Sequence, residues 1–207
     1  LPELITMDIL LDKLSGLKSI PVGLDKETLE PSVINFKTSK GQIICANDIE
    51  KCQGVLKNLL KTFINLGNVV SVLFDFEEVF EKLKPYTNSY CNGNFEKYID
   101  EIIKYIDEKI VNSEYQIMLV IVGVDKFKTT IPSLKITELT KKLKSVDNAS
   151  ILFVDNAYNL QVEIMNLCSK LSARWARIYQ QPIDRLACLQ VDLVNMAYNI
   201  NPVNYED

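Results

Sequence analysis

The sequence contains no histidine among its 207 residues. Histidine is the base or the ligand in Ser-His, Cys-His and His-metal chemistry, so these three types of site are excluded. Any catalysis would have to use carboxylates, lysines or thiols. The five cysteines have no C-x-x-C spacing, and their odd number suits a reducing compartment better than a disulfide framework.

Clusters of basic residues are also missing. The sequence has 23 Lys and Arg against 27 Asp and Glu, whereas a dedicated nucleic-acid binder carries a basic patch, so we expect no nucleic acid partner. No apolar run approaches the roughly 20 residues that span a bilayer. The sequence begins with Leu1 instead of methionine, and we expect it to be a cytosolic fragment of a longer protein.

Short apolar runs alternate with amphipathic segments along the chain. Runs such as VVSVLFD (Val69–Asp75) are almost continuously apolar, as in strands buried on both faces. This alternation predicts an α/β fold, a doubly wound and mainly parallel sheet flanked by helices. The expected strands are 33–36, 43–45, 69–75, 116–124 and 151–154, and the expected helices are 77–83, 95–111, 134–146 and 160–177.

The length and the hydrophobic content of 47% favour one domain over residues 1–207. We expect residues 1–40 to hold a lead-in helix and the first strand, because Pro21, Gly23 and Pro31 break any later helix. Residues 41–171 form the core. Residues 172–207 are expected to be helical, because Leu186, Leu189, Leu193 and Met196 recur at helical spacing.

The segment from Gly41 to Leu60 has the strand, turn and helix of a nucleotide-binding P-loop. A working loop reads G-x-x-x-x-G-K-[ST], in which backbone N–H groups cradle phosphates, lysine reaches the β and γ phosphates, and the hydroxyl binds magnesium. This sequence lacks the glycines and the hydroxyl when the motif is aligned with residues 46–53. It also lacks them when the motif is shifted by one residue so that Lys51 takes the lysine position. The corresponding positions are Ala46, Asn47, Asp48, Ile49, Glu50, Lys51, Cys52 and Gln53.

Two carboxylates, Asp48 and Glu50, stand where the phosphates would lie. Their negative charges would repel those of a bound triphosphate. Asn47 with Glu50 three residues later also forms a variant capping box, and acidic groups are favoured at a helix N-terminus. An ordinary capped helix after a strand explains these residues equally well.

An ATPase also needs an aspartate that orders magnesium and a glutamate that polarises water, after a second apolar strand. The run that ends in Val124 is followed by Asp125 and then by Lys126, and a lysine cannot act as this base. Later, Asp155 and Asn156 end a further apolar run, and we expect them to be turn residues.

The order of these segments resembles that of the FtsK/SpoIIIE class of motor ATPases. The specific part is IPVGLDKETLEP at residues 20–31, followed by QIICANDIEKCQGVLKNLL, VVSVLFD and MLVIVGVD. Within this class the sequence is most similar to the carboxy-terminal ATPase domain of the EssC/EccC family, the membrane coupling proteins of type VII secretion. The resemblance covers residues 1 to about 165 and implies a degenerate P-loop, RecA-like domain.

The resemblance implies ATP and magnesium only as ligands of the family. The vestigial pocket positions are Ala46, Asp48, Glu50, Lys51, Cys52, Gln53, Asp125 and Lys126, and we predict no catalytic residue, bound cofactor or metal. The expected function is recruitment of substrates or regulation of protein export, by a cytoplasmic domain of a cell-membrane protein. Expected partners are secreted helical hairpins of the WXG class, neighbouring ATPase domains of the same chain and copies of the parent protein.

The alternative hypothesis is an ATPase domain that binds nucleotide through Lys51 and Asp125 and powers translocation. In that case a neighbouring domain supplies the missing groups.

Overall fold

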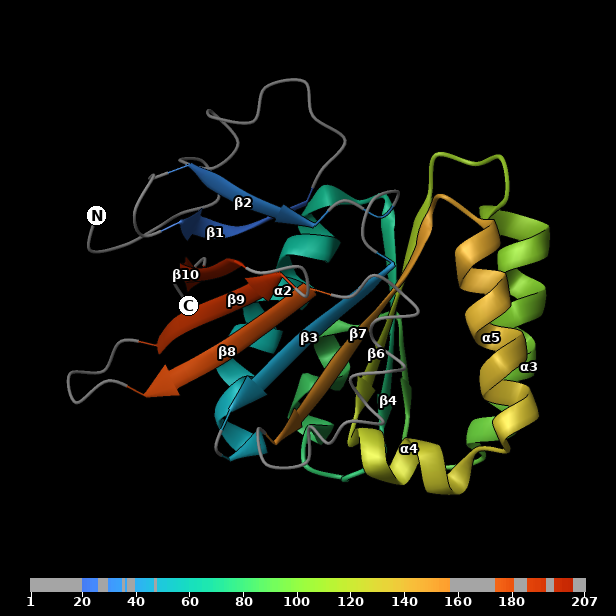
Figure 1. Cartoon of the computed structure of the whole chain (residues 1–207). Helices are drawn as coiled ribbons and strands as arrows, with labels where there is room; N and C mark the ends of the chain where they lie inside the picture. Colours follow the sequence, from blue (N-terminus) through green and yellow to red (C-terminus); the bar gives the residue numbers. More distant parts are fainter. Residues whose placement is uncertain are drawn as a thin grey trace.

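A computed structural model describes residues 20–25, 30–34, 36, 40–46, 48–156, 174–180, 186–192 and 196–202. These residues form one ten-stranded sheet in the order β2-β1-β10-β9-β8-β3-β7-β6-β4-β5, with helices on both faces (Figure 1). The predicted α/β class and mainly parallel, helix-flanked sheet are confirmed.

The half of the sheet from β3 to β5 is entirely parallel. It consists of β3 (Gly41–Ala46), β7 (Ala149–Asn156), β6 (Gln116–Val122), β4 (Val69–Asp75) and the short edge strand β5 (Ser89–Cys91). Each of the four longer strands is rich in apolar residues, which suits strands covered on both faces. One buried row runs across the register through Ile43, Phe153, Ile121, Phe74 and Cys91.

The other half begins with β8 (Arg174–Gln180), parallel to β3. Three antiparallel pairings then join β9 (Leu186–Asp192), β10 (Met196–Pro202) and β1 (Ile20–Asp25) to it, and β2 (Pro31–Ile34) pairs with β1 at the edge.

The predicted helical C-terminal part is therefore wrong. Residues 174–180, 186–192 and 196–202 are strands. The last four positions of the helix expected over residues 160–177 thus belong to β8, and its other positions lie outside the described residues. Apolar residues spaced by three or four positions are weak evidence for a helix when the segment is as short as this one. The β-branched and aromatic residues of RWARIYQ favour a strand that can pair with the free edge of β3.

The N-terminal part also differs from the prediction. The expected lead-in helix lies outside the described residues, and β1 occupies the segment whose prolines and glycine indicated irregular backbone. The register between β1 and β2 shifts between Pro21 and Gly23, and a bulge of this kind lets a sheet accommodate such residues. The strand expected at 33–36 is β2, which runs from Pro31 to Ile34.

The two faces of the parallel half carry separate hydrophobic cores. On one face η1 (Ile49–Cys52), α2 (Gln53–Leu66) and η2 (Glu81–Tyr86) cover Leu73, Val120 and Leu152. On the other face lie α3 (Phe95–Tyr105), η3 (Ile106–Ile110), α4 (Val124–Thr130) and α5 (Ser133–Ser145), which pack on Phe74, Ile121 and Phe153. Figure 1 shows α3 and α5 side by side on their face.

Two predicted helices match α3 with η3 and α5, but the helix expected over 77–83 is wrong. The chain instead turns after β4 and forms the 3-10 helix η2, which contains Pro85. The carboxylate of Asp75 accepts a hydrogen bond from the backbone N–H of Phe80 at 2.6 Å, which closes a loop where the helix was expected to begin. Proline lacks the N–H that an α-helical turn needs, and a short 3-10 helix tolerates it more easily.

Candidate functional site

The carboxyl ends of the parallel strands β3, β7, β6 and β4 lie along one edge of the sheet. Ligands of doubly wound proteins bind at this edge. Each candidate residue predicted from the sequence follows one of these strands, so this edge is the candidate site.

The turn after β3 is short and enters a helix almost at once. Ala46 is the last residue of β3, Asn47 lies outside the described residues, and η1 begins at Ile49. The cap is Asp48, whose carboxylate accepts a hydrogen bond from the N–H of Glu50 at 3.1 Å. The predicted cap by Asn47 is therefore wrong in its residue, although the helix end does carry its own carboxylates.

The remaining P-loop positions lie in the helical turns. Lys51 belongs to η1, and its side chain is outside what the structure describes. Cys52, the residue before α2, is fully buried and stands where the magnesium-binding hydroxyl would be, and Gln53 is the half-buried first residue of α2. Asp48 and Glu50 are exposed.

A phosphate cradle needs successive N–H groups that converge, which requires residues of left-handed conformation. None of the described residues 48–53 has a positive φ, and Asp48, Cys52 and Gln53 have φ values of -136°, -73° and -57°. The described part of this turn therefore lacks the backbone shape that cradles ATP phosphates, and the buried Cys52 offers no hydroxyl to magnesium.

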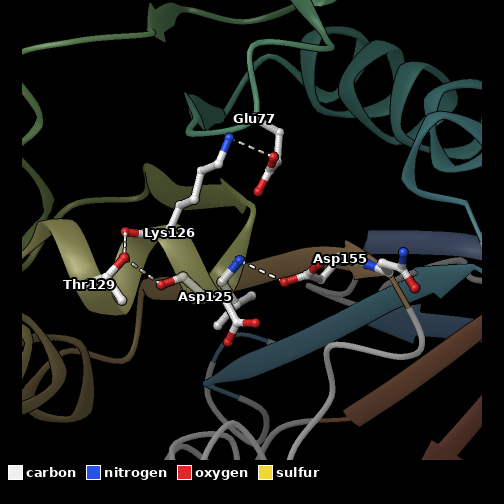
Figure 2. A network of polar contacts seen from close by, with 7 residues as sticks. Glu77, Asp125, Lys126, Thr129 and Asp155 are labelled. Atoms are coloured by element: carbon white, nitrogen blue, oxygen red, sulfur yellow. Dashed lines mark hydrogen bonds and ion pairs between the residues drawn. The ribbon is translucent and has the colours of Figure 1, made fainter.

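The end of β6 is bound to the loop after β4 by an ion pair. The ammonium of Lys126, in the first turn of α4, lies 2.8 Å from a carboxylate oxygen of Glu77, and Figure 2 shows the two side chains reaching toward each other. This hydrogen bond raises the pKa of Lys126. A charged lysine thus occupies the position of the water-polarising glutamate. Asp125 and Lys126 are both exposed.

Gly123 makes this contact possible. Its φ of +84° is unfavourable for any other residue, and a Cβ placed there would lie 2.7 Å from Cγ of Glu77. The backbone therefore lets the Glu77 side chain pass close to the end of β6.

Asp155, at the end of β7, is 1% exposed. One carboxylate oxygen accepts a hydrogen bond from the N–H of Val124 at 2.7 Å, and the other accepts one from the N–H of Asn156 at 2.6 Å (Figure 2). The prediction that Asp155 is a turn residue is wrong, because Asp155 lies within β7. Asp155 holds the first residue of α4 against β7.

Asp75, at the end of β4, is a second buried carboxylate that sequence reasoning missed. It is 0% exposed, and its Oδ2 accepts hydrogen bonds from the N–H of Phe80 at 2.6 Å and from the hydroxyl of Tyr90 at 2.9 Å. Its Oδ1 is buried without a hydrogen-bond partner among the described residues. The aspartate that ends an apolar run at Val69–Asp75 was the available signal.

Burial raises the pKa of Tyr90 well above its usual value, and the hydrogen bond to Asp75 raises it further. Above about pH 10 the unfolded chain therefore loses this proton more readily than the folded chain, so the free energy of unfolding falls as pH rises.

We expect Tyr90→Phe to lose less stability than the wild type between about pH 9 and pH 11, as measured by urea unfolding. Tyr115→Phe removes a hydroxyl from an exposed tyrosine and is the matched control; equal slopes in all three proteins would contradict this account.

Among the described residues, no three His, Cys, Asp or Glu side chains are arranged to hold a metal ion. Within the same part of the chain, no helix combines the length and apolar character needed to cross a membrane.

Comparison with known proteins adds to this description. No family model matches the sequence, and no curated protein matches it. Solved structures do match the fold. The cytoplasmic domain of the type VII secretion ATPase EccC of Thermomonospora curvata has a TM-score of 0.65 and 13% identity, over 100% of this chain and 28% of that chain.

Two structures of ATPases 2 and 3 are similar over the whole of this chain. The T. curvata EccC pair, in complex with a signal sequence peptide, has a TM-score of 0.63 and 12% identity over 44% of its length. The EssC pair of Geobacillus thermodenitrificans has a TM-score of 0.61 and 14% identity over 45% of its length. This chain thus spans less than half of each of these three chains. It has the fold of the EccC and EssC ATPase domains, and the resemblance to FtsK/SpoIIIE-type ATPases is confirmed at the level of the fold.

Proposed function

We propose that this chain is an ATPase-like module of a type VII secretion coupling protein that does not hydrolyse ATP and that acts in substrate recruitment or in regulation of export. The observation that carries the proposal is the carboxyl edge of the sheet. The turn after β3 has no described left-handed residue, and Lys126 is paired with Glu77 where a catalytic glutamate is needed.

Hydrogen bonds within the chain also occupy this edge, although Oδ1 of Asp75 has no partner among the described residues. Asp155 and Asp75 accept hydrogen bonds from backbone N–H groups of the chain itself, and the carboxylate of Asp48 bonds to its own turn. Polar groups that could bind a nucleotide are thus engaged in holding loops in place. These contacts support a structural function for this edge, namely holding the loops together.

A groove between α3 and β4, on the face of the sheet that α3 and α5 cover, supports a binding function. β5 pairs only with Val72, Leu73 and Phe74 of β4, so the first half of β4 is flanked by α3 without an intervening strand. The result is a groove of about 390 Å³. Its walls are mainly apolar and aromatic, with one charged residue, and include Val70, Val72, Tyr98, Glu101, Ile102 and Tyr105.

We assign this groove to the apolar stripe of a secreted helical hairpin of the WXG class. An amphipathic helix that docks in a groove uses apolar side chains spaced by three or four residues. One wall of the groove belongs to residues 88 and 89. The similarity to an EccC structure that contains a signal sequence peptide is consistent with a substrate-binding function.

The parent protein in this proposal is a membrane protein, and the module lies on its cytoplasmic side. Neighbouring ATPase domains of the same chain are further partners, as are copies of the parent protein. Nucleic acid is not among the partners, because the net charge is -4 and DNA binding needs many phosphate contacts.

Calorimetric titration with magnesium and ATP tests the loss of nucleotide binding. We expect no heat of binding for the 207-residue chain and no phosphate release above background, because the phosphates find neither a cradle nor a magnesium-binding hydroxyl. A micromolar affinity would contradict the proposal. If such affinity were lost in Lys51→Ala and Asp125→Ala variants, the alternative of a nucleotide-binding motor domain would replace it.

A further inference from the structure

The loop between β5 and α3 contains a dipeptide in which a backbone nitrogen can attack the preceding side chain. Asn92 is the only asparagine of the sequence that a glycine follows, and the pair lies between Cys91 at the end of β5 and Phe95 at the start of α3. Glycine has no Cβ that would shield its nitrogen or restrict its backbone. The nitrogen of Gly93 therefore reaches the side-chain carbonyl carbon of Asn92 more easily than the nitrogen of a larger residue would.

The structure leaves this pair unrestrained. The side chain of Asn92 is exposed, and neither Asn92 nor Gly93 has a hydrogen-bond partner among the described residues. Gly93 does not have a positive φ, and a Cβ built on it would meet no atom within 4 Å. The loop thus needs no glycine at this position, and no hydrogen bond holds the amide of Asn92 away from the neighbouring nitrogen.

Two other asparagines precede a small residue, serine, but hydrogen bonds restrain both pairs. Oδ1 of Asn88 accepts hydrogen bonds from the N–H and the hydroxyl of Ser71, at 2.8 Å and 3.3 Å. For Asn112 the restrained group is the attacking nitrogen, because the N–H of Ser113 donates to the carbonyl oxygen of Ile110 at 3.1 Å. These hydrogen bonds hold a reacting group at Asn88 and at Asn112, and no such bond exists at Asn92.

We propose that Asn92 is a site of spontaneous deamidation. After loss of its proton to a base in solution, the nitrogen of Gly93 forms a bond to Cγ of Asn92. The bond from Cγ to Nδ2 then breaks, and the amide nitrogen leaves as ammonia. Water opens the resulting succinimide at one of its two carbonyl carbons. Attack at Cγ gives aspartate, and attack at the backbone carbonyl carbon gives isoaspartate, whose main chain continues through Cγ; neither route needs an oxidant, a metal or an enzyme.

The position of Asn92 gives the reaction a structural consequence. β5 runs parallel to β4, so the new carboxylate lies at the carboxyl edge of the sheet, just before α3. Isoaspartate also adds a methylene group to the backbone between β5 and α3. Ser89 of β5 and Tyr98 of α3 both line the groove, so the modified residue lies in the segment that joins two of its walls. The chemistry itself is independent of any cargo.

Prolonged incubation of the folded 207-residue chain in mildly alkaline buffer at physiological temperature tests the proposal. Mass spectrometry of digested samples follows each asparagine, and an isoaspartyl methyltransferase with labelled S-adenosylmethionine measures isoaspartate. We expect Asn92 to deamidate at least about tenfold faster than Asn88 and Asn112, because it has the glycine and lacks the hydrogen bonds. In urea the rates at Asn88 and Asn112 should rise, while the rate at Asn92 should change little.

Gly93→Ala is the matched variant, because the structure has room for its Cβ. It should slow the reaction at Asn92 at least about tenfold and leave the circular dichroism spectrum unchanged. An unchanged rate in Gly93→Ala would overturn the proposal, as would equal rates at the three asparagines of the folded chain. Should Gly93→Ala fail to fold, the three rates of the wild type in buffer and in urea decide alone. Deamidation of Asn92 that occurs only in urea would then refute the proposal.

Discussion

Asp155→Ala is expected to lower the free energy of unfolding by roughly 2 to 4 kcal/mol, because a buried donor without a partner costs about 1 to 3 kcal/mol and two backbone donors lose their acceptor. These donors are the N–H groups of Val124 and Asn156, at 2.7 Å and 2.6 Å from the carboxylate. For a chain of this size the melting temperature should fall by roughly 5 to 15 °C. Thermal and urea unfolding followed by circular dichroism measure the change.

Asp125→Ala is the matched control, since it removes the same kind of side chain from an exposed position in α4, the helix that Asp155 holds. A surface change of this kind typically alters stability by less than about 0.5 kcal/mol. Asp155→Asn should fall between the two, because an amide keeps one acceptor but turns an NH₂ group toward a donor. If Asp155→Ala were as stable as Asp125→Ala, the carboxylate would contribute nothing to holding α4.

Two buried aspartates and one ion pair hold the segments at the carboxyl edge together. Asp155 joins β7 to the start of α4, and Asp75 joins β4 to Phe80 and Tyr90. Lys126 of α4 forms an ion pair with Glu77 of the loop after β4. The start of α4 and the loop after β4 are therefore bound to their neighbours by side chains of the chain itself.

The parallel core could be predicted because its strands leave no other solution. Val69–Asp75 and Gln116–Val122 are too apolar for a surface strand and too short for a buried helix, and helical segments separate them. The helix α3 was equally clear, since Ile99 and Ile102 recur at helical spacing and are both buried.

The antiparallel half could not be predicted from local pattern. Residues 186–192 contain leucines at a spacing that fits a helix, while the same segment gains ladder hydrogen bonds as β9 between β8 and β10. β1 contains Pro21 and Gly23, which disfavour a strand until a bulge and two neighbours accommodate them. In both cases partners distant in sequence decide the conformation.

The strand ends that carry the candidate residues could be predicted, but the interactions of those residues could not. Asp48, Asp125 and Lys126 do lie after the expected strands, because motif spacing locates strand ends. The role of Asp75 depends on Phe80 and on Tyr90, 15 residues away, and that of Asp155 on Val124, 31 residues away. Contacts of this range follow from sheet order, which no local pattern contains.

Removal of this module from the full-length protein is expected to abolish export of its cargo if the recruitment proposal holds. A sharper form of the test changes only the groove between α3 and β4. Tyr98→Glu with Tyr105→Glu places two charges on its aromatic wall, and a buried charge without a partner strongly disfavours an apolar ligand. We expect this variant to reduce secretion as severely as the deletion, measured by immunoblotting of culture medium against cell lysate.

Tyr115→Glu is the matched control, because Tyr115 is 54% exposed and does not line the groove. Its secretion should equal that of the wild type, and the amount of parent protein in the membrane fraction should be the same in all strains. Secretion that continues normally without the module would show that recruitment is wrong and would leave a structural contribution to the parent protein. Secretion lost on deletion but retained in the groove variant would place the binding surface elsewhere on the module, because the charges would then lie outside the contact with cargo.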